Sequence, residues 1–398
     1  MERVVITGLG VVGPHGVGLA PLLDAERVQG TSFSAWPANV ARPHDEALVA
    51  QVSDLQARRY FTERQMRLAD RAMLLASSAA GLAIEDAGLH GQEALLREAC
   101  TFLGTARAEL PSCYQFLRPQ LNEPREQLNA ADFPRIARNI ACGQVAIRFG
   151  LQGPSTVLAS GPLSSLEAAT RAARYIRTGR ATHALVGGFE ALSRFALYHF
   201  SQHQRAHLQA RHPAFFGTDP GLLVPSEGAC MLMLESLSSA RARGARIHAE
   251  IEGWCAGRVG DDENAAEVLA ERWQALSAGQ EPRVLALSSG GATRAHERAE
   301  SAALPAWCQR HPQAAVMAPR ALVGEGDAWA SALQLALAAN LLGQRESLPL
   351  HSLAPSADAS VQRAASARPL HGDLAVVSAM NETLHYSMLS LRRPPSEA

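Results

Sequence analysis

Short apolar runs alternate with alanine-rich helical stretches along this chain, and this order constrains its fold most strongly. Residues 3–12 read RVVITGLGVV, a run of branched side chains that favours a strand covered on both faces of its sheet. Similar strands are predicted in CTFLGTA, STVLAS, ATHALVGGFEAL, RVLALSSGG, AAVMAP and DLAVVSAM. Helices separate them, the longest of which is predicted to run from Glu63 and end at Gly88. Such an alternation predicts an α/β fold.

The pattern breaks near SLSSARARGA and then starts again with RIHAEIEGWCAG. We therefore expect two α/β halves of similar plan, residues 1–240 and 241–398, packed against each other. The repeat lies in the order of strands and helices, because no sequence identity between the halves is visible.

Composition narrows the classes of function. The 398 residues carry a formal net charge of −1, which gives no argument for a nucleic-acid or membrane partner. The sequence contains no lysine, so a lysine Schiff base and a P-loop lysine are both excluded. The six cysteines form no CxxC pair, so we expect no metal site and a reducing, cytoplasmic location. The first residues, MERVVITGLGVVGPHG, favour neither a signal peptide nor a membrane span.

A strand-to-helix corner in STVLASGPLSSLEAATRAARYI poses a chemical question. The strand STVLAS is followed by helical apolar spacing from Leu163 to Arg177. Many enzymes place a nucleophile at such a corner, but the corner residue here is Pro162. Proline has neither a thiol nor a backbone N–H, although it suits the first position of a helix. We expect this corner to begin a core helix and to carry no chemistry.

Four stretches, in order, resemble the β-ketoacyl synthases of the thiolase fold over nearly the whole chain. They are RVVITGLGVVGPHG, NIACGQVAIRFGLQGPS, VPSEGACMLMLE and ARARGARIHAEIEGW. The resemblance implies a layered αβαβα architecture of two pseudo-repeated halves, with two mixed sheets between helical layers, and a dimer.

The same resemblance implies that the catalytic residues of the family are missing. The family's nucleophilic cysteine lies in TACATG, and SGPLSS places Pro162 at that position. Its two active-site histidines lie in AHGTxTPxxD and KxxxGHxxGAxG, where this chain has Ser289 and Glu325. His296 falls later than the first of these histidines. The glycine loop GFGGTN corresponds to MNETLH, which contains no glycine.

Arg320 takes the lysine position of the second histidine motif, five residues before Glu325. An unpaired carboxylate at position 325 would repel a malonyl group, so Glu325 needs a partner or a proton. The spacing allows Arg320 to be that partner.

Other side chains offer alternatives at or near the corner. A shift of one or two residues would bring Ser160 or Ser164 to the nucleophile position, but no histidine motif near them indicates an activated serine. Cys142 and Cys230 fit core packing better than a nucleophile. The polar stretch SQHQRAHLQARH allows a metal site but favours a solvated surface; its histidines are His203, His207 and His212.

An emptied site implies a subunit that works with a partner. The resemblance is to the chain length factor of type II polyketide systems, which forms a heterodimer with an active ketosynthase and lacks its cysteine. The chain would then help to shape the acyl-chain tunnel for polyketide, aryl polyene or related polyene synthesis, with acyl carrier protein as a partner of the complex and no cofactor. A ketosynthase-like enzyme with altered chemistry, such as a decarboxylase or acyltransferase, and a homodimeric acyl-binding module remain open.

Candidates for the tunnel wall follow from position in the family. The segment ARAELPSCYQFL, residues 106–117, corresponds to the part that reaches toward the dimer interface and the tunnel. Its bulky or apolar side chains are Leu110, Cys113, Tyr114 and Phe116. Ordinary core or interface packing explains each of them equally well.

Overall fold

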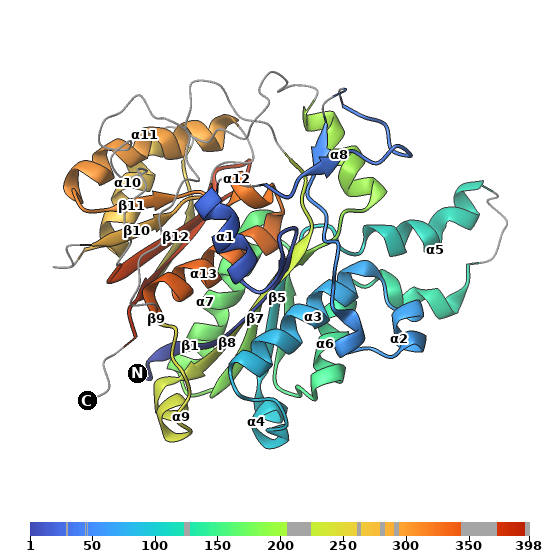
Figure 1. The fold of residues 1–398 in the computed structure, drawn as a ribbon, viewed down its shortest axis with the longest axis horizontal. Coiled ribbons are helices and arrows are strands. Elements are labelled where there is room, and N and C mark those ends of the chain that lie inside the picture. Colours follow the sequence, from blue (N-terminus) through green and yellow to red (C-terminus); the bar gives the residue numbers. More distant parts are fainter. Residues whose placement is uncertain are drawn as a thin grey trace.

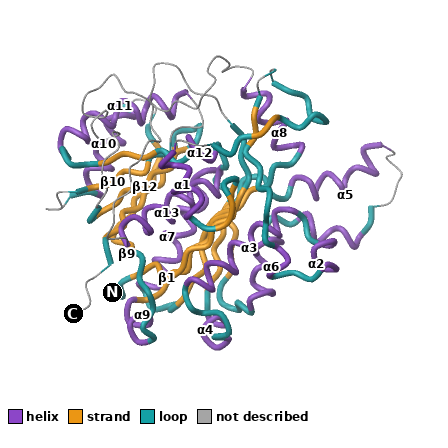
Figure 2. Tube along the Cα trace, viewed as in Figure 1, coloured by secondary structure: helices purple, strands orange, loops and turns teal. Residues whose placement is uncertain are grey.

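One large mixed sheet organises the chain. The computed structural model describes residues 1–28, 31–43, 45, 47–122, 128–204, 224–260, 264–278, 283–289, 294–343 and 372–394. Among these, the strands of the large sheet follow the order β11-β10-β12-β13-β9-β1-β8-β7-β5-β6, and Figure 2 shows them crossing the molecule. β2 (Gly16–Val17) pairs with β1, and β3 (Ser34–Ala35) pairs with β4 (Leu48–Val49).

The sheet consists of two halves that meet over a short contact. The first half contains β1 (Val4–Gly13), β8 (Gly228–Ser236), β7 (His183–Glu190), β5 (Cys100–Gly104) and β6 (Ser155–Leu158). The second contains β9 (Ala249–Arg258), β13 (His385–Arg392), β12 (Leu374–Met380), β10 (Val284–Leu287) and β11 (Ala315–Met317). β1 and β9 pair only from Val4 to Ile6 against Ala249 to Ile251. The two sheets expected from the sequence are therefore joined into one hydrogen-bonded path.

Helices form three layers around these halves (Figure 1). α3 (Arg71–Asp86) and α6 (Ile140–Phe149) cover the outer face of the first half. α7 (Ser164–Arg177) and α13 (Asp327–Gly343) lie between the halves. α10 (Ala265–Leu276) and α11 (Arg294–Arg310) cover the outer face of the second half. The layered αβαβα arrangement predicted for the chain is confirmed.

The central helices show why this sequence needs two sheet halves. α13 is rich in alanine and leucine on all sides, which is typical of a helix with no face toward water. α7 buries the apolar positions expected from its spacing, including Leu166, Ala169, Ala173 and Ile176. The remaining helical elements are α1 (Ala20–Val28), η1 (Ala57–Arg59), α2 (Glu63–Leu68), α4 (Glu93–Glu98), α5 (Leu110–Asn122), η2 (Ala130–Ile136), η3 (Gly161–Leu163), α8 (Arg194–Gln204), α9 (Leu237–Ala242) and α12 (Arg320–Val323).

The long helix predicted from Glu63 is two helices, so that prediction is wrong. Ala69 has an extended backbone, and α3 begins after Asp70. The Oδ1 atom of Asp70 accepts a hydrogen bond from the Met73 backbone N–H at 2.8 Å. An aspartate that caps a helix in this way satisfies a free N–H and favours a new start over continuation.

Candidate functional site

The corner after β6 is built by close approach of two helices. Pro162 is buried in η3, the 3-10 turn that precedes α7, rather than at the first α-helical position. Its carbonyl accepts a hydrogen bond from the Ser331 hydroxyl of α13. Gly161 has φ +60°, a conformation that favours glycine, and Ser165 donates a hydrogen bond to the Ala328 carbonyl at 2.5 Å. The start of α13 therefore lies directly against the corner.

The serines beside Pro162 form hydrogen bonds within the turn. The Ser164 hydroxyl donates to the Gly161 carbonyl at 2.7 Å and accepts from the Ser160 N–H at 2.8 Å. The Ser160 hydroxyl donates to Glu167 at 2.8 Å. Within the described residues, no histidine hydrogen-bonds to either serine. The arrangement does not support a serine nucleophile, which requires an adjacent general base.

Glu325, which the resemblance assigns to the second histidine position, forms a buried ion pair. Its Oε2 atom lies 2.6 Å from Nη1 of Arg320, and the two side chains are 4% and 1% exposed. Its Oε1 atom accepts the Asp327 backbone N–H at 3.0 Å. This is the pairing that the spacing of the two residues allows. Both oxygens of the carboxylate are thus engaged, Oε2 by an internal cation and Oε1 by the N-terminus of α13.

Ser289, which the resemblance assigns to the first histidine position, faces a second buried carboxylate, that of Glu300. Its hydroxyl donates to Glu300 Oε1 at 3.0 Å, and Ser378 donates to the same oxygen at 3.0 Å. Ser288 donates to Glu300 Oε2 at 2.5 Å, while its carbonyl accepts from Gln334 of α13 at 2.5 Å. A hydroxyl engaged in this way cannot replace an imidazole as a proton donor near physiological pH.

Trp329 is a feature of the site that the sequence reasoning missed. It stands at the alanine of KxxxGHxxGAxG and is completely buried. A Cβ atom on Gly228 would lie 2.8 Å from the indole, and one on Gly326 would lie 1.8 Å from its Nε1. The indole therefore fills space that only glycine neighbours leave open. A tryptophan within a motif of small residues was the available signal.

A second ion pair lies beside the corner. Arg107, in the loop after β5, pairs with Asp327 at the start of α13. Glu190, at the end of β7, accepts hydrogen bonds from Thr105 Oγ1 at 3.0 Å and from the Arg107 N–H at 3.3 Å. Burial raises the pKa of Glu190 to about 7, although the Arg107 guanidinium and these hydrogen bonds oppose the rise. Charged groups thus gather where the loops after β5, β6 and β7 meet.

Comparison with known proteins identifies the family. The family described as "Beta-ketoacyl synthase, N-terminal domain" matches residues 1–240. The chain belongs to the beta-ketoacyl synthase family.

Individual relatives in this family are distant. The chain is 29% identical over 404 residues to the putative polyketide beta-ketoacyl synthase 2 of Streptomyces halstedii, which covers 92% of each chain. It is 27% identical over 267 residues to 3-oxoacyl-[acyl-carrier-protein] synthase 2 of Staphylococcus aureus strain COL, over 65% of this chain and 63% of that protein. The match thus spans just under two thirds of the S. aureus protein. The solved ishigamide ketosynthase/chain length factor superposes with a TM-score of 0.83 at 22% identity, covering 99% of this chain and 100% of that one.

The segment at the position of the ketosynthase glycine loop is a tight hairpin turn between β12 and β13. Asn381 Oδ1 accepts from the Thr383 N–H at 3.1 Å and from the His385 N–H at 3.0 Å. Leu384 has φ +57°, and its N–H donates to the Asn381 carbonyl at 3.0 Å. The backbone N–H groups of Thr383, Leu384 and His385 are therefore used within the turn and are not presented to an acyl oxygen.

The remaining candidate nucleophiles and ligands do not form a site. Cys142 Sγ lies 3.3 Å from Ser155 Oγ, and burial raises its pKa to about 11. Burial also raises the pKa of the Cys230 thiol, so neither is a reactive thiolate. No group of metal-binding side chains occurs within the described residues. His207 and His212 lie outside the described residues, as do the side chains of His203 and His296.

The four tunnel candidates all lie on α5, but their surroundings differ. Tyr114 lines a groove of about 980 Å³ between α5, the start of α3 and α8, and its ring lies 4.9 Å from that of Phe195. Leu110 is half-buried, and neither it nor Cys113 nor Phe116 lines this groove. Cys113 Sγ contacts the Ile136 carbonyl at 3.6 Å, and the Phe116 ring lies 6.0 Å from that of Phe133; both neighbours belong to η2.

Proposed function

We propose that this chain is the non-catalytic partner of an active ketosynthase, of the chain length factor type, in polyketide, aryl polyene or related polyene synthesis. The observation that carries the proposal is the corner at Pro162. Condensation needs a thiolate to hold the acyl chain and backbone N–H groups to hold its oxyanion. Proline supplies neither, and Ser289 and Glu325 are committed to internal contacts where imidazoles are required.

An edge strand supports assembly with a partner. Among the residues that the structure describes, β6 is the last strand in the order and its only hydrogen-bonded neighbour is β5. On the neighbouring helix α6, Ile147 is 77% exposed. An uncovered edge beside a large apolar side chain is a site for strand pairing or aggregation. We infer that the partner's sheet continues this one beyond β6.

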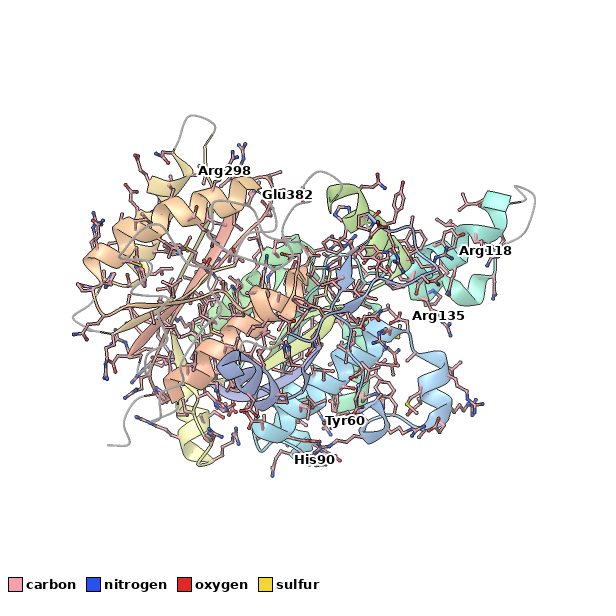
Figure 3. The ribbon with its side chains drawn as sticks, turned by 45° about the horizontal axis from the view of Figure 1, so that its top comes forward. Tyr60, His90, Arg118, Arg135, Arg298 and Glu382 are labelled. Atoms are coloured by element: carbon pink, nitrogen blue, oxygen red, sulfur yellow. The ribbon has the colours of Figure 1, made fainter. Side chains whose placement is uncertain are left out.

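A second exposed apolar surface lies on α5 and η2, which we together call the α5 arm. Tyr114, Leu117, Leu121 and Phe133 are all exposed large hydrophobic side chains of this arm. The arm projects from the body of the fold (Figure 1), and Figure 3 shows Arg118 and Arg135 on it. Apolar side chains with arginines around them are the usual composition of a protein interface. We infer that the arm lies against the partner.

The division of roles follows from these features. The partner supplies the cysteine, both histidines and the main contacts with acyl carrier protein, while this chain closes the acyl tunnel with the α5 arm. We propose that residues 1–240 and 241–398 form the two halves of this subunit.

The cysteines and helices bear on where the chain works. The six cysteines form no disulfide, which fits a reducing cytoplasm. The described helices include none long and apolar enough to cross a membrane.

Co-expression with an intact ketosynthase from the same organism tests the proposal. We expect the two chains to purify as a 1:1 complex that buries on the order of 2,000 Å² or more. Alone, this chain should aggregate or form a homodimer that exchanges with the ketosynthase. Light scattering that shows a well-behaved monomer at micromolar concentration would refute the proposal.

A further inference from the structure

The ion pair between Arg107 and Asp327 stands beside the vacant corner. Resting on the function proposed above, we propose that this pair shuts the subunit's own corner to the acyl chain, so that the far end of the chain lies on the α5 arm. Arg107 would then be a specificity-determining residue of the complex. It limits how far the shared tunnel reaches into this subunit.

The position of Asp327 places the pair at the corner. Its Oδ1 atom would lie 3.8 Å from a Cβ on Gly161, the residue before Pro162. Asp327 has φ +45°, which is uncommon for a residue other than glycine. Its backbone N–H donates to Glu325 and its side chain pairs with Arg107, so this conformation is held at both ends. The carboxylate therefore stands next to the point at which an acyl chain would be attached in an active subunit.

The position of Arg107 is also fixed from several sides. Its guanidinium carbon lies 4.9 Å from the centre of the Phe200 ring, which covers one face of the cation. Its backbone N–H is held by Glu190, the buried carboxylate at the end of β7. The Arg107 and Asp327 side chains are only 19% and 12% exposed. The cation thus bridges the loop after β5 and the start of α13 across the corner.

A hydrocarbon chain cannot enter such a place without cost. It would either strip the remaining water from two charges or separate them, and both steps are unfavourable in a poorly hydrated site. The groove lined by Tyr114 and Phe195, by contrast, has mostly apolar walls. The physical preference of an acyl chain is therefore for this groove between α5, α3 and α8.

The test compares acyl access to the corner in the parent protein and in a charge-free variant. Arg107→Met with Asp327→Asn removes both charges together, and asparagine tolerates the φ of position 327. The matched control is Arg138→Met with Glu109→Gln, which removes an ion pair between the residue before α5 and the segment after η2. The full-length chain, prepared in its non-aggregated fraction, is photolysed with a diazirine-bearing hexadecanoic acid. Labelled peptides are then mapped by mass spectrometry.

We expect the parent and the control to show no label in residues 155–165, and the charge-free variant to show at least tenfold more label there. Label at the corner in the parent protein, or a folded charge-free variant with no gain, would overturn the inference. If the charge-free variant does not fold, the parent decides: label confined to α5 and α8 supports the inference, and label at the corner refutes it. The ketosynthase takes no part in this experiment, so its result is separate from that of co-purification.

Discussion

Loss of Arg320 should destabilise this chain strongly, because its partner carboxylate cannot reach water. Arg320 and Glu325 are buried together with 2.6 Å between Nη1 and Oε2. In Arg320→Met, Glu325 must stay ionised without its cation or take up a proton. Removal of one partner from a buried pair costs about 3–5 kcal/mol. For a chain of this size, that corresponds to a fall in the unfolding midpoint on the order of 5 °C.

The double variant separates the charge from the packing. Nε and Nη2 of Arg320 have no hydrogen-bond partner among the described residues, so the pair itself contributes little net stability. Arg320→Met combined with Glu325→Gln should therefore recover most of the loss of the single variant, with a coupling free energy of about 2 kcal/mol or more.

Differential scanning calorimetry at pH 7 measures these changes. The control is Arg392→Met, which removes the exposed partner of Glu252 in a pair of similar length, 2.7 Å. That change should cost less than about 1 kcal/mol. If Arg320→Met loses no more stability than Arg392→Met, the inference that Glu325 depends on an internal cation is wrong.

Three further predictions concern the corner, acid stability and the tunnel. Pro162→Cys should form no carbon–carbon bonds from carrier-protein substrates, because Ser289 and Glu325 supply no imidazole. The assay includes a partner whose own cysteine is mutated. Turnover near that of an intact ketosynthase would contradict this prediction. Burial alone would raise the pKa of Glu235, but hydrogen bonds from His183, Arg243 and Thr7 outweigh it and hold the pKa at about 2. About 3 kcal/mol of stability, present above pH 4.5, should therefore disappear as the pH falls toward 2; denaturant unfolding should show a smaller loss in Glu235→Gln. Tyr114→Ala should lengthen the product of the complex, measured by mass, because it enlarges the groove; unchanged length in an intact complex would count against the tunnel role.

Much of the fold could be predicted because the pattern of buried side chains is local. The branched run before Gly13 and the alanine-rich stretch after Pro162 each identify their element without reference to any other. The break at Asp70 was missed, because apolar spacing continues across it and the capping oxygen decides the outcome. The joining of the two sheet halves was also missed. It depends on pairs between Val4–Ile6 and Ala249–Ile251, which no local pattern records.

In the candidate site, too, the residues that occupy motif positions could be predicted from the sequence, whereas contacts between distant residues could not. Pro162, Ser289 and Glu325 could be assigned to the family's catalytic positions, as a prediction, because motifs preserve spacing, and Arg320 lies close enough in sequence to Glu325 for the spacing to allow their pairing. The pair between Arg107 and Asp327 joins residues 220 positions apart, and no motif connects them. On the proposed function, the absence of the family's cysteine and histidines leaves this chain with no condensation chemistry of its own. On the same proposal, the charges of Arg107 and Asp327 beside the corner limit where an acyl chain can go. We therefore expect replacement of Arg107, rather than of Pro162, to change the behaviour of the proposed complex.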